Sequence, residues 1–290
     1  MLSASGCGSV SQSTKATVYG EGTQQRTAAA AAADNAIADV VKSPDIDTPA
    51  TLSAGIILAG ADSASPPLEY LAVVITKVAD EEKKETTLVG FEWDLCQAVA
   101  KKLGLEPQYV QTSWSDLVPG LEEGRLDILV SARSTTPERL QELVATDTYL
   151  AADLAICTSK SATLADERAL KGKIVGVQLD TSAQTAVEGI DGIAEVRTYA
   201  QILRAFQELN AGNLDAVVAD EIMTEWILDN TPRYDETLRI SGQIETGEGY
   251  AFWCAEQNQE LVAAVNAALA ELRDEGVYRK ICAKWGLSVE

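Results

Sequence analysis

The stretch LEEGRLDILVS, residues 121–131, decides the fold class, because a second stretch of the same form, LNAGNLDAVVA, occupies residues 209–219. Both follow the pattern L-x-x-G-x-L-D and continue into an apolar run. A glycine after an apolar helical turn is typical of a helix C-terminus, and a short apolar run beside it is typical of a buried strand. Each stretch therefore predicts the same unit, a helix that ends at glycine and is followed by a strand.

Two further stretches are paired in the same way. GIILAGAD at residues 55–62 and KIVGVQLD at residues 173–180 are apolar strands that run into an aspartate and then into a loop with serine or threonine. The chain is therefore predicted to contain two half-related α/β lobes that face one another across a cleft. Ligands of open α/β sheets bind beyond the carboxyl ends of the strands. We expect the functional site where these doubled strands end.

The composition narrows the possible functions. The 290 residues, 46% of them hydrophobic, suffice for two lobes of about 100 residues each. A formal net charge of −21 argues against nucleic acid or an anionic membrane surface as the main partner. Histidine is absent, which excludes Ser-His-Asp and Cys-His catalysis and removes the commonest metal ligand. We expect no metal and no cofactor, and no apolar run approaches the roughly 18 residues of a membrane span.

The alternation of strand and helix patterns predicts where the lobes begin and end. Residues 1–50 are rich in Ser, Thr, Gln and Ala, and we expect a largely disordered tether whose alanine-rich part forms at most a marginal helix. The first lobe is predicted to comprise residues 51–150 and 256–290, and the second lobe residues 151–255. The chain then crosses between the lobes twice, which forms a hinge. Helices are expected at residues 91–103, 114–123, 137–144, 259–274 and 277–285.

Two residues at predicted strand ends carry charges suited to a small zwitterion. Arg139 follows Thr136-Pro137, a typical helix start, and its planar guanidinium matches a carboxylate; the alternative is an arginine on an exposed helix surface. Asp220 ends the strand of the second repeat and can accept hydrogen bonds from an ammonium group; the alternative is an N-cap of the next helix. Arg139 on one lobe and Asp220 on the other would hold a zwitterion from both sides.

Taken together, the motifs resemble those of the polar amino-acid binding proteins of bacterial ABC importers, solute-binding protein family 3. The resemblance covers about residues 53 to 287 and depends on the order and spacing of the motifs. They are GAD at 60–62 with Pro66-Pro67, VGFEWDL at 89–95, WSDLVPGL at 114–121, DILVS at 127–131, TPER at 136–139, LKGKIVGV at 170–177, LDAV at 214–217 with Asp220, and DEGVY at 274–278. The resemblance implies an α/β, two-lobed periplasmic-binding-protein-like fold (type II), with two chain crossings at the hinge.

The resemblance also implies how the backbone part of an amino acid is held. Arg139 would pair with the ligand α-carboxylate, helped by the backbone and hydroxyl groups of residues 181–182. The α-ammonium group would bind Asp220, together with the Ser131 carbonyl and Ser134. These groups would serve any free amino acid, whatever its side chain.

The side-chain pocket is where this sequence departs from the family pattern. Trp114 would line that pocket, with plain core packing as its alternative, and Asp62 would meet a basic or polar side chain. Ser65 stands where the family commonly has an aromatic residue, and Tyr70 could fill that space; Asp180 stands where glycine is frequent. The complete set expected at the ligand is Asp62, Ser65, Tyr70, Trp114, Ser131, Ala132, Ser134, Arg139, Gln178, Thr181, Ser182 and Asp220.

The cysteines point to a location outside the cytoplasmic membrane. Ala4-Ser5-Gly6-Cys7 resembles the end of a bacterial lipoprotein signal, which implies lipidation of Cys7 and a protein anchored by lipid alone; the alternative is a chance cysteine in a tail. Alignment with the family places Cys157 and Cys254 on strands of the second lobe, and Cys96 and Cys282 on helices of the first. Any disulfides are expected within lobes, and the alternative is four buried thiols.

The resulting functional hypothesis is a non-catalytic, monomeric receptor that clamps a free amino acid, basic or polar by preference, and delivers it to ABC permease subunits. One alternative is the ligand-sensing domain of a signalling receptor. Another is an enzyme on the same fold, similar to cyclohexadienyl dehydratase, in which Glu69, Glu92 or Glu221 would be the catalytic carboxylate. A dimeric amino acid such as cystine stays open as the cargo.

Overall fold

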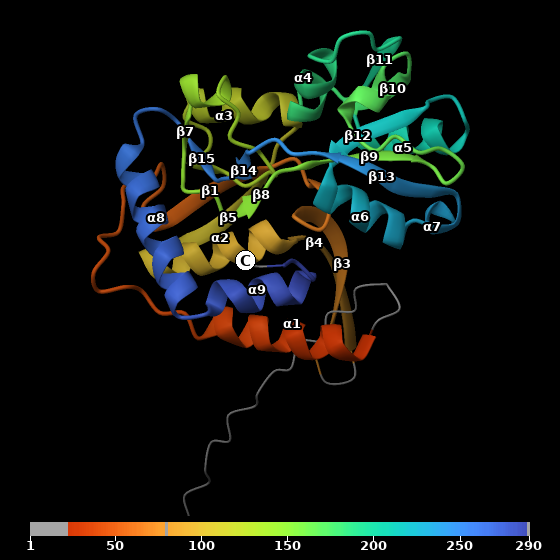
Figure 1. Ribbon diagram of the computed structural model, residues 1–290. Helices are drawn as coiled ribbons and strands as arrows, with labels where there is room; N and C mark the ends of the chain where they lie inside the picture. The colour runs from red at the N-terminus through yellow and green to blue at the C-terminus, as the bar shows by residue number, and fades with distance from the viewer. Residues whose placement is uncertain (1–22, 79–80, 289–290) are drawn as a thin grey trace, which may run out of the picture.

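A five-stranded sheet forms the centre of the first lobe in the computed structural model, which describes residues 23–78 and 81–288 (Figure 1). Its strand order is β5-β1-β6-β15-β7, and β1 runs parallel to β5 and β6 whereas β15 runs antiparallel to β6 and β7. The strands are β1 (Ile56–Ala61), β5 (Glu106–Gln111), β6 (Ile128–Leu129), β7 (Val144–Ala145) and β15 (Trp253–Cys254).

Helices cover both faces of this sheet. One face packs on α2 (Phe91–Leu103), α8 (Gln259–Asp274) and α9 (Val277–Trp285), and the other on the turn η1 (Trp114–Asp116) and α3 (Leu117–Glu122). Ile128 and Val130 belong to the first of these two cores and Leu129 to the second, as the alternation of side chains along a strand requires.

Helix α2 begins and ends where the sequence predicts. Its apolar stripe Leu95, Val99 and Leu103 is buried, and Gly104 closes the helix with φ 71°, a left-handed conformation that favours glycine. At the other end, Gly90 has φ 138°, and the first helical N–H groups donate to backbone oxygens of the segment that precedes β3. Phe91 N donates to the Pro67 oxygen at 3.0 Å and Glu92 N to the Leu68 oxygen at 2.9 Å.

The second lobe is built on its own five-stranded sheet, of order β11-β10-β12-β9-β13. The strands are β9 (Leu154–Ser159), β10 (Ile174–Gln178), β11 (Glu195–Tyr199), β12 (Ala216–Asp220) and β13 (Leu238–Ile244). The helical segments are η3 (Glu167–Leu170), α4 (Ser182–Glu188), α5 (Ile202–Asn210), α6 (Glu221–Asn230) and α7 (Tyr234–Thr237). Two apolar clusters, one on each face of the sheet, form the core of this lobe.

The repeated L-x-x-G-x-L-D motif, called the L-D motif below, has the same structural role in both lobes. Asp127 accepts from Leu58 N on β1 at 2.8 Å, and Asp215 accepts from Ile174 N on β10 at 2.8 Å. The preceding leucines pack alike, since Leu126 lies against Gly60 of β1 and Leu214 against Gly176 of β10. The motif therefore fastens the strand that follows it to the first parallel strand of its lobe, which explains why it occurs twice.

The two chain crossings lie side by side as β8 (Leu150–Ala151) and β14 (Gly249–Tyr250), which pair antiparallel. Shortly after β14, strand β15 already belongs to the first-lobe sheet, so the expected second-lobe boundary at residue 255 is about four residues too late.

Cys254 was expected on a second-lobe strand, and this is wrong because β15 pairs with β6 and β7. Cys96, Cys157, Cys254 and Cys282 are all buried free thiols.

The described part of the expected tether, residues 23–50, is packed against the first lobe. Helix α1 (Thr23–Ala38) lies along α9 (Figure 1), and Ala33, Ala36 and Ile37 are buried there. Lys284 of α9 bonds Asp34 at 2.6 Å and Asp94 of α2 at 2.8 Å. Tertiary packing therefore orders a helix whose sequence shows little amphipathic pattern, whereas residues 1–22 and Cys7 lie outside the described residues.

Truncating Ile37 tests this docking. Ile37→Ala is expected to lower the free energy of unfolding by about 2 kcal/mol, the low end for a buried isoleucine, and the melting temperature by about 4 °C. Val41→Ala is the matched control, because Val41 is 72% exposed and its truncation removes no packing. Thermal unfolding of both variants decides the question; equal melting temperatures would mean that α1 is a free tether.

Two of the expected helices are shorter or divided in the structure. The helix expected at 137–144 is a single turn, η2 (Arg139–Gln141), and the helix expected at 114–123 is divided into η1 and α3. A three-stranded antiparallel sheet of β2 (Ala64–Ser65), β3 (Glu69–Val78) and β4 (Glu81–Val89) adjoins the first lobe. Among the helices of residues 23–78 and 81–288, none combines the length and the hydropathy of a membrane span.

Candidate functional site

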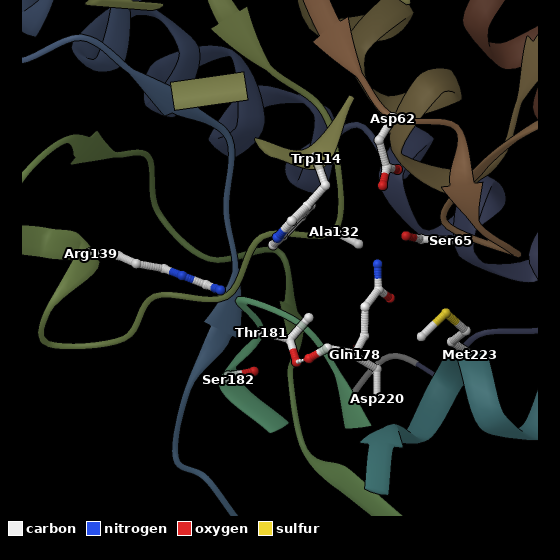
Figure 2. A pocket seen from close by; sticks show the side chains of 10 residues that line it. All are labelled: Asp62, Ser65, Trp114, Ala132, Arg139, Gln178, Thr181, Ser182, Asp220 and Met223. Carbon is white, nitrogen blue, oxygen red and sulfur yellow. Dashed lines mark hydrogen bonds between the residues drawn. The ribbon is translucent and has the colours of Figure 1, made fainter. Parts of the chain in front are cut away.

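A pocket that is partly open to solvent lies between the two lobes where β1, β10 and β12 end. Figure 2 shows side chains from both lobes converging on it. The first lobe contributes Asp62, Ser65, Trp114, Ala132 and Arg139. The second lobe contributes Gln178, Thr181, Ser182, Asp220 and Met223. The predicted position of the site, at the carboxyl ends of the doubled strands, is therefore where the structure has its interlobe pocket.

Arg139 extends into the pocket between Trp114 and the 181–182 loop (Figure 2). Its guanidinium donates to the Ser134 carbonyl at 3.2 Å and hydroxyl at 3.0 Å, and to the Asp180 carbonyl of the other lobe at 3.3 Å. Burial lowers the pKa of Arg139, and the nearby carboxylates of Glu248 and Asp220 oppose that change. Arg139 is thus a fixed, half-buried cation on the pocket wall and not a freely solvated surface arginine.

Trp114 is held in position by the two neighbouring arginines and by the Asp180 carbonyl. The Arg133 and Arg139 guanidinium carbons lie 5.5 and 5.7 Å from the centre of its ring, within cation–π range. The indole N–H donates to the Asp180 carbonyl at 3.3 Å, so this oxygen receives bonds from two first-lobe side chains. Asp180 has φ 60°, a conformation that favours glycine, at the position where glycine was expected. Trp114 is half-buried at the pocket and is not plain core.

The second-lobe wall presents hydroxyls and one carboxylate. Thr181 caps α4, since its hydroxyl accepts from Gln184 N at 3.3 Å and donates to the Gln178 carbonyl at 2.8 Å. Asp220 accepts from the Tyr250 hydroxyl, and its side chain makes no capping bond to α6. Burial raises the pKa of Asp220, while the Tyr250 bond and the charge of Arg139 lower it. The pocket thus has a cation on one wall and an acid on the other.

Comparison with known families agrees with this geometry. Residues 58–288 match the sequence profile of the bacterial extracellular solute-binding proteins, family 3. The chain belongs to this family. The match includes both lobes and both crossings, and it begins after helix α1.

The chain is also similar to proteins named for an amino acid. A probable histidine-binding protein of Campylobacter jejuni subsp. jejuni is 30% identical over 207 residues, which are 71% of this chain and 79% of the relative. The L-cystine-binding protein TcyJ of Escherichia coli is 27% identical over 234 residues, which are 80% of this chain and 82% of the relative. These relatives are named as binding proteins.

Solved structures of amino-acid-binding proteins share this fold. An ancestral arginine-binding protein bound to arginine is 31% identical with a TM-score of 0.70, and the match covers 80% of this chain and 98% of that one. The ancestral amino acid-binding protein AncCDT-1, described as a precursor of cyclohexadienyl dehydratase, is 28% identical with a TM-score of 0.67 and is covered over 95% of its length, against 80% of this chain. The predicted type II periplasmic-binding-protein-like fold is confirmed.

Nine of the twelve residues expected at the ligand of this family 3 protein line the pocket, and Tyr70, Ser131 and Ser134 do not. Ser134 lies behind Arg139 and accepts its hydrogen bonds. Ser131 lies behind Asp62, and its hydroxyl accepts from Asp62 N at 3.1 Å. Both serines therefore support pocket residues, and their direct contact with a ligand stays a prediction.

Tyr70 is not among the residues that line the pocket. It follows Glu69 on β3, so the two side chains lie on opposite faces of the strand, and Glu69 is the one directed toward Ser131. The Tyr70 ring packs against two tryptophans instead: its centre lies 5.5 Å from the ring centre of Trp226 of α6 and 6.2 Å from that of Trp285 of α9. The space left at Ser65 is therefore not filled by Tyr70.

Met223 is the pocket residue that the sequence analysis missed. It lies on the first turn of α6, three residues after Asp220, and helical spacing brings these positions to one side of the chain. Its flexible thioether lies near Gln178 and Ser65 in Figure 2. The signal was available in the spacing from Asp220, but a methionine at the start of a buried helix is typical of core.

Proposed function

We propose that this protein is the extracytoplasmic amino-acid receptor of an ABC importer, which closes its two lobes around a free amino acid. The observation that carries the proposal is the placement of Arg139 and Asp220 on opposite lobes of one pocket. A carboxylate suits the planar guanidinium fork, and an ammonium group suits the aspartate. A ligand that carries both groups on one carbon joins the lobes, which is what hinge closure requires.

The energetics suit reversible binding. Each charge-assisted hydrogen bond contributes about 1.5–3 kcal/mol, and a micromolar complex needs about 8 kcal/mol. Two or three such bonds, together with burial of the ligand side chain against Trp114 and Met223, reach this value without any chemical step. Delivery to permease subunits, a monomeric state and attachment through lipid at Cys7 belong to the same proposal.

A thermal-shift screen of the ligand-stripped protein tests the proposal. At a hundredfold excess over its dissociation constant, a ligand that binds only the folded protein adds about 2.7 kcal/mol to the free energy of unfolding, or a few degrees in melting temperature. We expect selective shifts with α-amino acids. Stabilisation by cyclic carboxylates alone would contradict the receptor proposal.

Asp62 is proposed to set the preference for a basic or polar side chain. Its carboxylate lines the pocket and is held by Ala64 N at 3.1 Å and by the Ser131 hydroxyl at 3.3 Å. Asp62→Asn is expected to lower the affinity for a cationic amino acid by about tenfold relative to a neutral one, because one charge-assisted contact is lost. Calorimetric titration with arginine and glutamine measures this ratio, and an unchanged ratio contradicts the role.

The enzyme alternative draws support from the likeness to a dehydratase precursor. The carboxylates suggested for catalysis are poorly placed for it, since Glu69 and Glu92 lie behind the pocket wall and Glu221 accepts from Gln243 outside the pocket. Incubation with a prephenate-like cyclic acid, followed by product analysis, discriminates the two functions: turnover favours an enzyme, and amino-acid binding without turnover favours the receptor. The sensor alternative has no further observation in its favour.

A further inference from the structure

Three carboxyl groups lie together in the first lobe, at the end of the pocket occupied by Asp62. Asp62 lines the pocket, whereas Glu69 of β3 and Glu92 of α2 are fully buried behind it. The Ser131 hydroxyl lies 3.3 Å from Asp62 Oδ1 and 3.3 Å from Glu69 Oε1, and so connects the first two. The second oxygen of Glu69 is buried with no hydrogen-bond partner.

Glu92 completes the cluster from the start of α2. Ala132 N donates to its Oε2 at 2.9 Å, and the Tyr149 hydroxyl donates to its Oε1 at 2.5 Å. Ala132 itself lines the pocket, so one end of the cluster, Asp62, lies in the pocket wall and the other, Glu92, is one residue from it. The cluster lies on the first-lobe side of the site and is separate from Arg139 and Asp220.

The groups that face the cluster leave its charge unbalanced. Tyr109 of β5 lies near Asp62 and Glu69, Cys96 of α2 near Glu92, and Tyr149 and Tyr250 near both glutamates. All four are neutral at physiological pH, because tyrosine and cysteine side chains ordinarily ionise only at higher pH and burial raises the pKa of each further. The ion pairs found within residues 23–78 and 81–288 involve none of the three acids.

Buried acids that share a site without a cation cannot all ionise. Burial raises the pKa of Glu92 to about 7 and that of Asp62 above its ordinary value. Burial and the neighbouring acids Glu92 and Asp62 raise the pKa of Glu69 well above its ordinary range. The cluster therefore holds at least one proton near neutral pH, and a cation placed beside it would favour loss of that proton.

We propose that a cationic ligand side chain entering beside Asp62 displaces a proton from the Asp62–Glu69–Glu92 cluster, so that binding of a cationic amino acid releases a proton to solvent. This inference rests on the proposed receptor function and adds a coupling to it. No covalent bond forms: an O–H of a buried carboxyl ionises, the proton goes to water, and the cation compensates the new carboxylate. A neutral side chain offers no such compensation and leaves the cluster protonated.

The sign of the pH dependence follows. Protons compete with the cation, so affinity for a cationic amino acid rises with pH through the range in which the free cluster titrates, by up to about tenfold per unit for one proton. The affinity for a cationic amino acid becomes constant at higher pH, where the cluster of the free protein has already ionised. Affinity for a neutral amino acid stays flat over the same range.

Calorimetric titration of the full chain with L-arginine and L-glutamine, at pH 7 in phosphate and in Tris, tests this coupling. The buffers differ in ionisation enthalpy, so the difference in heat gives the protons released. We expect about 0.5–1 proton per arginine and close to none per glutamine. Glu69→Gln should reduce the release, whereas Glu123→Gln, which removes an exposed carboxylate of a surface ion pair, should not.

The outcomes separate the coupling from the receptor function. Arginine binding without proton release, or with the same pH profile as glutamine, overturns the coupling, and so does binding confined to neutral amino acids; both leave the receptor function intact. Binding of no amino acid at any pH overturns the receptor function and the coupling with it. If Glu69→Gln does not fold, the arginine and glutamine profiles of the unaltered protein from about pH 5.5 to about pH 8.5 decide.

Discussion

Arg139→Ala is expected to weaken the binding of every amino acid, basic or neutral, by about 30-fold to about 5,000-fold. The loss corresponds to about 2–5 kcal/mol, the cost of leaving one partner of a buried, hydrogen-bonded charge pair alone. The guanidinium is already aimed at the pocket by Ser134 and by the Asp180 carbonyl, so the unaltered protein needs no rearrangement to receive a carboxylate. Titration calorimetry with several amino acids measures the effect.

Two further variants make this test specific. Arg139→Lys keeps the charge but loses the planar fork, so it should retain part of the affinity. Arg125→Ala is the matched control, because Arg125 pairs with Glu123 on the surface and its loss should not change binding. The assignment is contradicted if Arg139→Ala, like Asp62→Asn, changes only the ranking of ligands.

The largest effect on stability is expected from Gly90→Ala. A Cβ at this position would lie 2.1 Å from the Leu68 carbonyl oxygen and 2.7 Å from the Glu69 Cα, and neither backbone atom can move without displacing β3. The φ of 138° adds backbone strain for any residue with a side chain. The steric overlap and the backbone strain together are expected to lower the free energy of unfolding by about 3–5 kcal/mol, which is a large part of the stability of an ordinary domain.

Gly212→Ala is the control for Gly90→Ala. Gly212 also has positive φ, at 80°, but a Cβ added there would meet no atom within 4 Å, so only the backbone term of about 1 kcal/mol applies. Chemical denaturation of both variants separates the two contributions. Equal losses would mean that the close approach of α2 to β3 is not what requires glycine at position 90.

The elements that could be predicted have strong local signals. Helices α2, α8 and α9 have the bounds expected from the sequence, because apolar periodicity and glycines at their ends limit them. The carboxyl ends of β1, β10 and β12 were expected to meet where the lobes face each other, and the pocket lies there. Individual residues of the side-chain pocket, such as Trp114 and Ser65, were expected only from the family resemblance. The paired stretches at residues 55–62 and 173–180 identified β1 and β10, and the repeated L-x-x-G-x-L-D motif identified β12.

The features that were missed depend on tertiary context. The alanine-rich segment shows no clear apolar face, and only the surface of α9 makes α1 a defined part of the first lobe. Cys254 lies in a fully buried run, residues 250–255, whose composition cannot distinguish one sheet from the other. The expected direction of Tyr70 was wrong because the start of β3 sets which neighbour faces inward, and that register is not visible in the sequence.

The docking of α1 along α9 also determines how a mechanical load passes through the molecule. The first and last helices of the described chain both belong to the first lobe and are joined there by Lys284. A pull on α1 is therefore borne by α9 and α2, and the path of force does not pass through β8, β14 or the pocket. The second lobe lies outside this path, so a pull on α1 should not change how tightly the cleft closes.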